Sequence, residues 1–417
     1  MKKIVVAVSA AVLGCANVSA HVSDAEWAEF KKEYSALVER VNALAAENNE
    51  LKAAAAGLGT VTVEDLEATN EAIAALTQQN KATSWAEDVR WQGDFRMRWE
   101  EIEDDSKDDE RTRARVRARA ALIADLDNDV EIGLGMATGG DDPVSTNQTL
   151  GGGGSTKDIR LDLAYFKWKP NEWYLGGGKF KNPLYRSFKS ALIWDGDFRP
   201  EGVFGGYKGD NFFVTGMYSW IESDSSKDDE EFWALQGGTS FGPVNASLGY
   251  LYIPTEGRVA AHDSQDCFGN SCAEIPGSGG DLAYLYDYEV VNASLDASFE
   301  LGGLLWGLYG DFIQNQDADD YDTGWIVGTK LGKAKKPGSW QLQYQYQELE
   351  ADATLGLVTD SDFMGGGTDG KGHKLGAAYA IHSKWQLALT YFDGTRGMDL
   401  GKDVDYQRLM LDTKFKY

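Results

Sequence analysis

From Val89 to the C-terminus, hydrophobic and polar residues alternate along much of the chain. In one such segment, Trp340, Leu342 and Tyr344 are separated by glutamines. A period of two places the hydrophobic set on one face of a β-strand and the polar set on the other. Segments of about ten residues with this alternation, separated by turn residues, are typical of transmembrane β-barrels. We therefore expect an all-β transmembrane barrel of antiparallel strands over residues 89–417.

The connections between these segments support a barrel. Short connections, such as 127–129 and 242–243, alternate with long ones rich in Asp, Gly and Ser, apart from one short link at 315–321. Short turns on one side and long loops on the other are typical of bacterial barrels. The expected strands number about sixteen, an even count that leaves both barrel ends on one side. They lie at 89–100, 111–124, 130–138, 158–169, 173–181, 201–208, 211–221, 231–241, 244–253, 284–299, 304–314, 322–332, 339–350, 371–381, 385–394 and 403–417.

Ahead of the barrel the hydrophobic spacing is helical. Apolar residues recur at alternating spacings of three and four, the a/d pattern of a coiled coil, with Asn48 at one core position. Ser23 and Glu26 fit a capping box at the start of this helix. We expect an α-helical coiled-coil stalk over residues 21–84; a single helix that lies against the barrel or plugs it is the alternative. The seam consists of Trp27, Phe30, Tyr34, Leu37, Val41, Leu44, Asn48 and Leu51.

The first residues have the plan of a secretory signal peptide. A basic start precedes a short apolar stretch, which ends in a small-residue exit site at Ala20. We expect the signal peptide to cover residues 1–20; a lipoprotein box ending at Cys15 is the alternative, which Leu13 disfavours. No later segment is a continuous apolar stretch of spanning length. For an exported chain this leaves a soluble protein or a barrel, since only helices and closed barrels satisfy the backbone within lipid.

Composition and charge agree with a barrel. Glycine occurs 48 times, proline only 8 times, and aromatic residues make up 12%, a mix that suits strands with one lipid-facing and one wet side. A net charge of −26 argues against a nucleic-acid partner. Without the signal peptide, Cys267 and Cys272 remain, and in an oxidising compartment we expect them to form a small-loop disulfide. A metal site is disfavoured, because only these two thiols are present and His262 has no second histidine beside it; no cofactor is expected.

The last expected strand ends on an aromatic residue. Leu411, Phe415 and Tyr417 face one way, and a C-terminal aromatic on such a strand resembles the signal read by the outer-membrane barrel assembly machinery. We therefore expect that machinery to bind the chain through Tyr417. Tryptophans near the short turns fit an interfacial girdle, with ordinary cross-strand packing as the alternative. They are Trp91, Trp168, Trp173, Trp340 and Trp385.

Three stretches of the barrel resemble a known family. They are Ala164-Tyr165-Phe166, Gly178-Lys179-Phe180-Lys181-Asn182-Pro183, and Leu192-Ile193-Trp194-Asp195 through Arg199-Pro200-Glu201-Gly202. With them, residues 89–417 resemble the Gram-negative putative porins, similar in plan to trimeric sixteen-stranded porins. The resemblance implies a homotrimer in the outer membrane, in contact with lipid and lipopolysaccharide, which passively admits small hydrophilic solutes. The stalk would then lie in the periplasm; its length departs from the best-known general porins and leaves the mode of anchoring open.

Arginines occupy every second position of the second expected strand. A period of two places them on one face, and a guanidinium facing lipid near the midplane costs about 2–4 kcal/mol, so this face lines the lumen. Three arginines of the first strand share it. The alternative role is structural, in which the arginines only pair with wall carboxylates such as Asp94 and Glu131. The predicted basic wall consists of Arg90, Arg96, Arg98, Arg111, Arg113, Arg115, Arg117 and Arg119.

The third long connection, residues 182–200, is expected to fold inward opposite this wall, as third loops do in the porins that it resembles. Opposed charges at a constriction set the selectivity of a channel. The wall favours anions, whereas acidic loops at 101–109, 224–231 and 317–322 attract cations outside. Because distant charges are screened, we expect a weak anion preference. The charged residues of the expected constriction are Arg186, Lys189, Asp195, Asp197, Arg199 and Glu201.

Other classes of function fit the sequence less well than a porin. A Ser-His hydrolase needs a base beside a nucleophile, and none of the four histidines has such a placement, so an enzyme is not expected. An energised receptor-transporter needs a larger barrel and a globular plug. The remaining alternative is a structural protein that tethers the envelope through its N-terminal coiled coil at residues 21–84.

Overall fold

The computed structural model describes residues 24–55, 67, 69–75, 77, 88–222 and 230–417. The chain divides into two units, Met1–Asp88 and Val89–Tyr417. The expected signal peptide at residues 1–20 lies outside the described residues, as does Ser23 of the expected capping box.

The first unit contains one long helix, α2 (Asp24–Ala55), and a second helical stretch that includes residues 69–75. The helix predicted from the spacing is therefore confirmed. Its apolar seam, from Phe30 to Leu51, is exposed in the single chain, and such a seam is the surface that a coiled-coil partner covers. Within the described part of the chain, no helix has both the length and the hydropathy that a membrane crossing requires.

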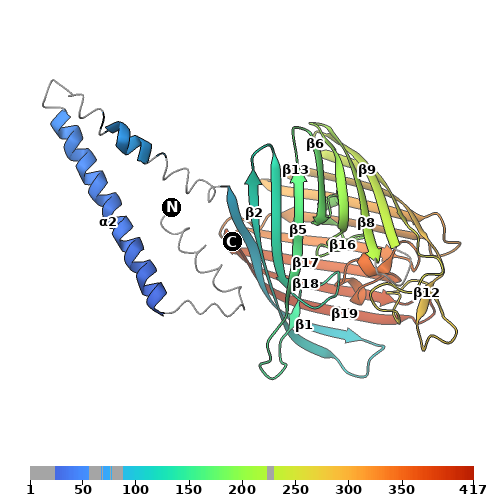
Figure 1. Cartoon of the computed structure of the whole chain (residues 1–417). Coiled ribbons are helices and arrows are strands. Elements are labelled where there is room, and N and C mark those ends of the chain that lie inside the picture. The colour runs from blue at the N-terminus through green and yellow to red at the C-terminus, as the bar shows by residue number, and fades with distance from the viewer. Residues whose placement is uncertain (1–23, 56–66, 68, 76, 78–87, 223–229) are drawn as a thin grey trace. The chain divides into compact units, whose positions relative to one another are not determined.

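The second unit is a closed antiparallel β-barrel (Figure 1). Its sheet has 17 strands, of which β4 (Gln148–Thr149) is a two-residue segment within a connection, so sixteen strands make the circuit. Closure comes from β1, which pairs with β2 on one side and with β19 on the other. The sixteen strands are β1 (Val89–Asp104), β2 (Arg111–Leu126), β3 (Val130–Thr138), β5 (Ile159–Trp168), β6 (Trp173–Lys179), β7 (Glu201–Lys208), β8 (Phe212–Glu222), β9 (Glu230–Phe241), β10 (Val244–Ile253), β13 (Tyr288–Leu301), β14 (Leu304–Asn315), β15 (Thr323–Gly332), β16 (Trp340–Leu349), β17 (Gly370–His382), β18 (Trp385–Arg396) and β19 (Val404–Lys416).

The predicted sixteen-stranded barrel is confirmed, with differences at strand ends. β1 continues to Asp104 rather than 100, because its ladder with β19 extends through that residue. β13 begins at Tyr288 rather than 284. The residues before it are used elsewhere, since β12 (Leu282–Tyr284) pairs with β11 (Cys272–Glu274) in a separate hairpin.

The outer face of the barrel is apolar, as the alternation predicts. In β1, Phe95, Met97 and Trp99 are exposed, whereas Arg96 and Arg98 between them are buried. In a membrane the exposed set contacts lipid, and the buried set faces the barrel interior.

Turns join the strands at one end of the barrel, here called the turn end, and mostly longer loops join them at the other, the loop end. Four loops reach the interior or the site described below. Loop 2 (139–158) follows β3, loop 3 (180–200) follows β6, loop 5 (254–287) follows β10, and loop 7 (350–369) follows β16.

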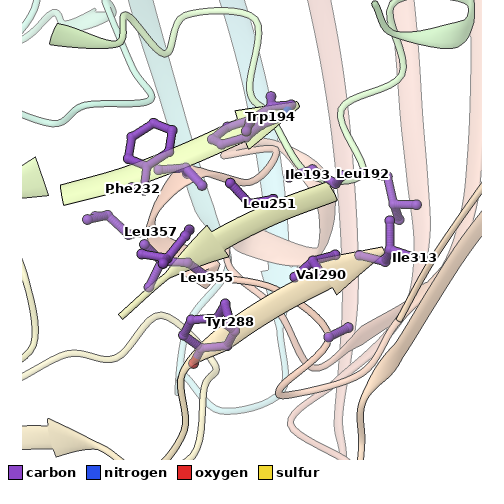
Figure 2. Packing of buried hydrophobic residues seen from close by; sticks show 14 of the residues in the cluster. Leu192, Ile193, Trp194, Phe232, Leu251, Tyr288, Val290, Ile313, Leu355 and Leu357 are labelled. Atoms are coloured by element: carbon purple, nitrogen blue, oxygen red, sulfur yellow. The ribbon is translucent and has the colours of Figure 1, made fainter. Parts of the chain in front are cut away.

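An apolar cluster fills one side of the barrel interior. Leu192, Ile193 and Trp194 of loop 3, with Leu355 and Leu357 of loop 7, pack over inward-facing residues of β9, β10, β13 and β14 (Figure 2). A polar inner face was expected on the strands, but here both faces are apolar, and the loops keep the inner one from water. Full burial of side chains of this size contributes about 1.5–3 kcal/mol each, so the cluster holds the loops inside the barrel.

The C-terminal residue is attached to the first hairpin of the barrel. The backbone N–H of Tyr417 donates to Gly93 O over 3.1 Å, its hydroxyl donates to Arg119 O over 2.9 Å, and its ring stacks on Trp91. Trp173 and Trp385 are exposed near the turns and also stack on neighbouring rings, so the girdle and the cross-strand packing occur together.

Candidate functional site: a charged layer inside the barrel

Three adjacent strands, β19, β1 and β2, carry charged residues on their inner face. Arg98 of β1 lies opposite Arg115 of β2 and opposite Asp412 of β19. Since the inner faces of neighbouring strands stay in phase, these side chains form one continuous surface, here called the charged wall. The charged wall consists of Asp94, Arg96, Arg98, Glu100, Arg113, Arg115, Arg117, Arg119, Arg408, Asp412 and Lys414.

Glu100 is the centre of the part of the wall nearest to the loop end. Its side chain is fully buried and accepts hydrogen bonds from Arg113 and Arg408; Arg408 Nη2 lies 2.6 Å from Glu100 Oε2. Arg115 is a looser partner, with its Nη1 at 3.7 Å from Glu100 Oε1. A buried carboxylate is costly unless it is paired, and three guanidiniums meet that need.

Loop 7 contributes a carboxylate to the wall. Arg98 Nη1 lies 2.9 Å from Asp362 Oδ2, and Arg408 Nη2 lies 3.0 Å from Asp362 Oδ1. Arg98 also donates from Nε to Asp412 Oδ1 over 2.8 Å. Burial raises the pKa of Asp362, but the Arg98 and Arg408 guanidiniums outweigh it and hold the pKa well below its ordinary value. Asp362 is therefore ionised and joins loop 7 to two strands.

Loop 2 meets the wall through neutral polar groups. Arg96 Nη2 donates to Asn147 Oδ1 over 2.5 Å, and Arg115 Nη2 donates to Ser145 Oγ over 3.3 Å. Asn147 Nδ2 in turn donates to Ser145 Oγ over 3.1 Å. These contacts leave the charges of Arg96 and Arg115 largely uncompensated by loop 2.

Loop 3 reaches the wall through Asp197. Its Oδ1 lies 2.6 Å from Arg119 Nη1 and its Oδ2 lies 3.5 Å from Arg117 Nη1. Asp94 pairs with the other side of the same guanidiniums, at 2.8 Å from Arg117 and 2.7 Å from Arg119. Burial alone raises the pKa of Asp197, but Arg117, Arg119 and Arg199 outweigh it and hold the pKa at about 2. Loop 3 thus extends to the arginines of β2 by an ionic contact.

Asp195, two residues earlier, joins loop 3 to loop 7. Its Oδ2 accepts hydrogen bonds from the backbone N–H of Ser361 over 3.0 Å and from Ser361 Oγ over 3.2 Å. Its own backbone N–H donates to Val358 O over 2.8 Å. Burial raises the pKa of Asp195 to about 8, and the neighbouring Asp360 and Asp197 carboxylates add to the shift. At neutral pH Asp195 is therefore mostly protonated, unlike Asp197.

Two more charged residues of the predicted constriction lie inside the barrel. Arg186 Nη1 donates to Trp194 O over 2.7 Å, which ties two parts of loop 3 together. Arg199 Nε lies 3.1 Å from Asp162 Oδ1 of β5. Lys189 is exposed, so it is not part of the buried charged layer.

Glu201 was expected at the constriction and does not lie there. It is the first residue of β7, and its side chain shares the outer face with Val203, where it pairs with Lys179 at 2.5 Å. The reason is the period of two, because Gly202 and Phe204 face the interior. Glu201 is therefore removed from the candidate site.

Two arginines of the predicted wall lie near its ends. Arg90 is half exposed near the turn end and pairs with Asp125 and Glu131, both at 2.8 Å. Arg111 is exposed at the loop end of β2. The six remaining arginines of the prediction belong to the charged wall.

Two cavities flank the layer that loops 3 and 7 form with the wall. A cavity of about 700 Å³ near the loop end is lined by residues that include Arg113, Arg115 and Ser361. A cavity of about 510 Å³ towards the turn end is lined by residues that include Arg119 and Asp195. The layer between them has eight cations, the arginines and lysine of the wall, and five carboxylates, so three positive charges are in excess. The carboxylates are Asp94, Glu100, Asp197, Asp362 and Asp412.

Residues 102–246 and 283–415 match the family described as putative porin. The chain belongs to this family. Family and fold together indicate a channel rather than an enzyme. No curated protein sequence is significantly similar to this chain.

Solved structures show the same fold as this porin-family barrel. OprB of Pseudomonas putida, in a structure at high pH, is 14% identical with a TM-score of 0.55, over 82% of this chain and 97% of OprB. OmpF of Salmonella typhi, in complex with daunomycin, is 11% identical with a TM-score of 0.50, over 79% of this chain and 97% of OmpF. At such identities the likeness concerns the fold alone.

Several residues of the porin-family site were missed in the sequence. Arg408, Asp412 and Lys414 alternate with the apolar residues of the last strand, so the period of two marks their face. Asp362 and Asn147 lie in loops without regular spacing, and no sequence signal brings them to the wall. Cys267 and Cys272 are joined by a disulfide within loop 5, away from the charged wall. Among the described residues, no group of three or more His, Cys, Asp or Glu side chains could hold a metal ion.

Proposed function

We propose that the chain forms a water-filled channel in the outer membrane of a Gram-negative bacterium, through which small hydrophilic solutes and ions diffuse passively. The observation that carries this proposal is the charged layer between two cavities inside a closed barrel. Charged side chains on an interior wall suit a wet pathway, because they would be costly in a dry core. Membership of the putative porin family supports the same function.

The charged layer favours a weak anion preference. Most arginines of the wall have a carboxylate partner, so the structural role considered for them accounts for much of their charge. The excess lies mainly with Arg96 and Arg115, whose contacts to loop 2 are neutral. Acidic side chains outside, such as those at 317–322, are farther from the layer and act through screened interactions.

The assembly that we propose is a homotrimer in contact with lipid and lipopolysaccharide. The apolar outer face of the barrel supports the membrane setting. The exposed seam of α2 supports a coiled-coil stalk at residues 21–84, on the periplasmic side, with three strands as the porin resemblance implies. Tyr417, bonded to the β1–β2 hairpin at the end of the last strand, remains the proposed signal for the barrel assembly machinery.

Single-channel recording of the purified chain in a planar bilayer tests the channel. We expect a pore with current proportional to voltage and, in a salt gradient, a small reversal potential on the anion side. Charge reversal at Arg115 and Arg117 to Glu should move the reversal potential to the cation side. Absence of conductance from protein whose barrel is folded would overturn the proposal.

A second candidate function is a tether to the cell envelope, favoured by the exposed seam of α2. Deletion of residues 21–84 separates the two functions. If the porin function is correct and the stalk is a tether, the shortened chain conducts normally, whereas the outer membrane detaches from the cell wall. If envelope attachment is unchanged, the tether function is wrong.

A further inference from the structure

The disulfide between Cys267 and Cys272 closes a ring of six residues in loop 5. Each residue between the two cysteines contacts loop 7. Asn270 has the largest share, with Nδ2 donating to Ala351 O over 2.7 Å and to Thr354 O over 2.8 Å. Its Oδ1 accepts a hydrogen bond from the Gly356 backbone N–H over 2.8 Å. One buried amide thus satisfies three backbone groups of loop 7, which would otherwise be buried without partners.

The other ring residues hold loop 7 at both of its ends. Ser271 donates from its backbone N–H to Asp352 Oδ1 over 2.9 Å and from Oγ to Asp352 Oδ2 over 2.5 Å. At the far end of loop 7, the backbone N–H of Thr368 donates to Phe268 O over 2.9 Å. The ring therefore bridges residues that are distant along loop 7.

Glycines allow the ring and loop 7 to come this close. A Cβ atom on Gly356 would lie 2.1 Å from Phe268 O, and one on Gly367 would lie 2.2 Å from the same oxygen. On the ring side, a Cβ on Gly269 would lie 2.5 Å from Thr368 O. No side chain fits between the two backbones, so the contact is specific to this geometry.

Loop 7 continues from this contact to the charged layer. Ser361 holds Asp195 of loop 3 by two hydrogen bonds, and Asp362 pairs with Arg98 and Arg408 of the wall. A displacement of loop 7 would therefore move a carboxylate of the layer and the loop that reaches Arg119. The ring touches none of the wall residues itself.

We propose that the disulfide ring of loop 5 positions the charged layer of the channel through loop 7, with Asn270 as the main positioning residue. The closed ring limits the backbone conformations of residues 267–272 and so keeps Asn270 directed at loop 7. Opening the ring frees loop 7 and loop 3 to fluctuate, while the barrel strands stay paired. This inference deepens the proposed channel function and, for its electrical readout, rests on it.

The first test opens the ring in the full chain. An added dithiol gives two electrons and two protons to the disulfide, which becomes two thiols, and the dithiol closes to its own cyclic disulfide. We expect the variance of the single-channel current to rise about twofold or more, since a loosened loop visits several positions. Reoxidation restores the original trace. The double variant Cys267→Ser with Cys272→Ser should show the higher variance from the start and no response to the dithiol.

Two further variants separate the contacts from the bond. Asn270→Ala keeps the disulfide and removes the hydrogen bonds to loop 7, and Gly356→Ala inserts a methyl group at the same contact. Both should reproduce the noisy channel under oxidising conditions. Gln265→Ala, at an exposed position of loop 5 outside the ring, is the matched control and should behave as the original chain.

Hydrogen exchange supplies a readout that does not depend on conduction. We expect the amides of Asp195 and Thr368, which donate across these contacts, to lose about tenfold of their protection when the ring is opened, with strand amides unchanged. Unchanged protection and current variance in the opened-ring protein would overturn the inference, and so would losses spread over the strands. If the oxidised chain never conducts, the channel function is wrong, and the exchange data still decide the role of the ring.

Discussion

Replacement of Arg115 by Gln tests whether the unbalanced charge of the layer sets selectivity. Arg115 is the loosest partner of Glu100, at 3.7 Å, and its other contact is to a neutral hydroxyl. Glu100 keeps Arg113 and Arg408 after the change, so we expect the barrel to fold as before. The substitution therefore removes one of the three excess positive charges without leaving a buried carboxylate unpaired.

The size of the effect follows from Coulomb's law. A unit charge at roughly 6 Å from a permeating ion contributes about 0.7 kcal/mol in water, and screening at physiological ionic strength reduces this to about 0.3 kcal/mol. Loss of the charge disfavours the anion and favours the cation by that amount each. The ratio of anion to cation permeability should therefore fall about threefold, since 1.4 kcal/mol corresponds to a factor of ten.

The assay is the reversal potential of single channels in a potassium chloride gradient, measured for Arg115→Gln and for the matched variant Arg90→Gln. Arg90 loses the same charge from a half-exposed site near the turn end. It lies about 25 Å along the strand from the level of Arg115, well beyond a Debye length, so its variant should match the original chain. Equal shifts in the two variants, or a permeability ratio unchanged by Arg115→Gln, would refute local control by the layer.

Three further predictions concern the loops and the stalk. Because burial raises the pKa of Asp195 to about 8, its neutral form favours the contact between loops 3 and 7 at low pH, and this stabilisation is lost as pH rises through about 8; current noise should increase from pH 6 to 9, but not in Asp195→Asn. Trp194→Ala removes a buried ring of the interior cluster, at a cost of about 3–5 kcal/mol, and should raise the mean conductance by loosening loop 3, whereas the outward Trp233→Ala should not. Leu44→Asp in the seam of α2 should lower the temperature at which trimers dissociate on gels, with Ala45→Asp, beside the seam, as the control; equal effects would contradict a coiled coil.

Regular strands were predictable because their signal is local. The alternation of Phe95, Met97 and Trp99 with Arg96 and Arg98 reports which face meets lipid, and no distant residue is needed to interpret it. The same period correctly placed six arginines on the interior surface. It also explains the error at Glu201, which was grouped with the preceding loop although its position in the alternation belongs to the outer face.

The interior of the barrel was less predictable, because its contacts join residues that are far apart in the chain. Phe232 and Ala234 face inward on a strand whose outward residues are also apolar, and only the packing of loops 3 and 7 explains why they avoid water. A strand that is apolar on both faces is thus a usable sign of a covered inner wall.

The sequence by itself determined the strand number, the lipid-facing side of each strand and the row of arginines, since all three depend on a period of two within single segments. The tertiary structure alone decided which charges neutralise them. Arg98 and Asp362, for example, are 264 positions apart in the chain and meet at 2.9 Å. Loop conformation depends on packing inside the closed barrel rather than on local propensity, so the excess charge of the layer and the role of the loop 5 ring emerge only when the barrel has formed.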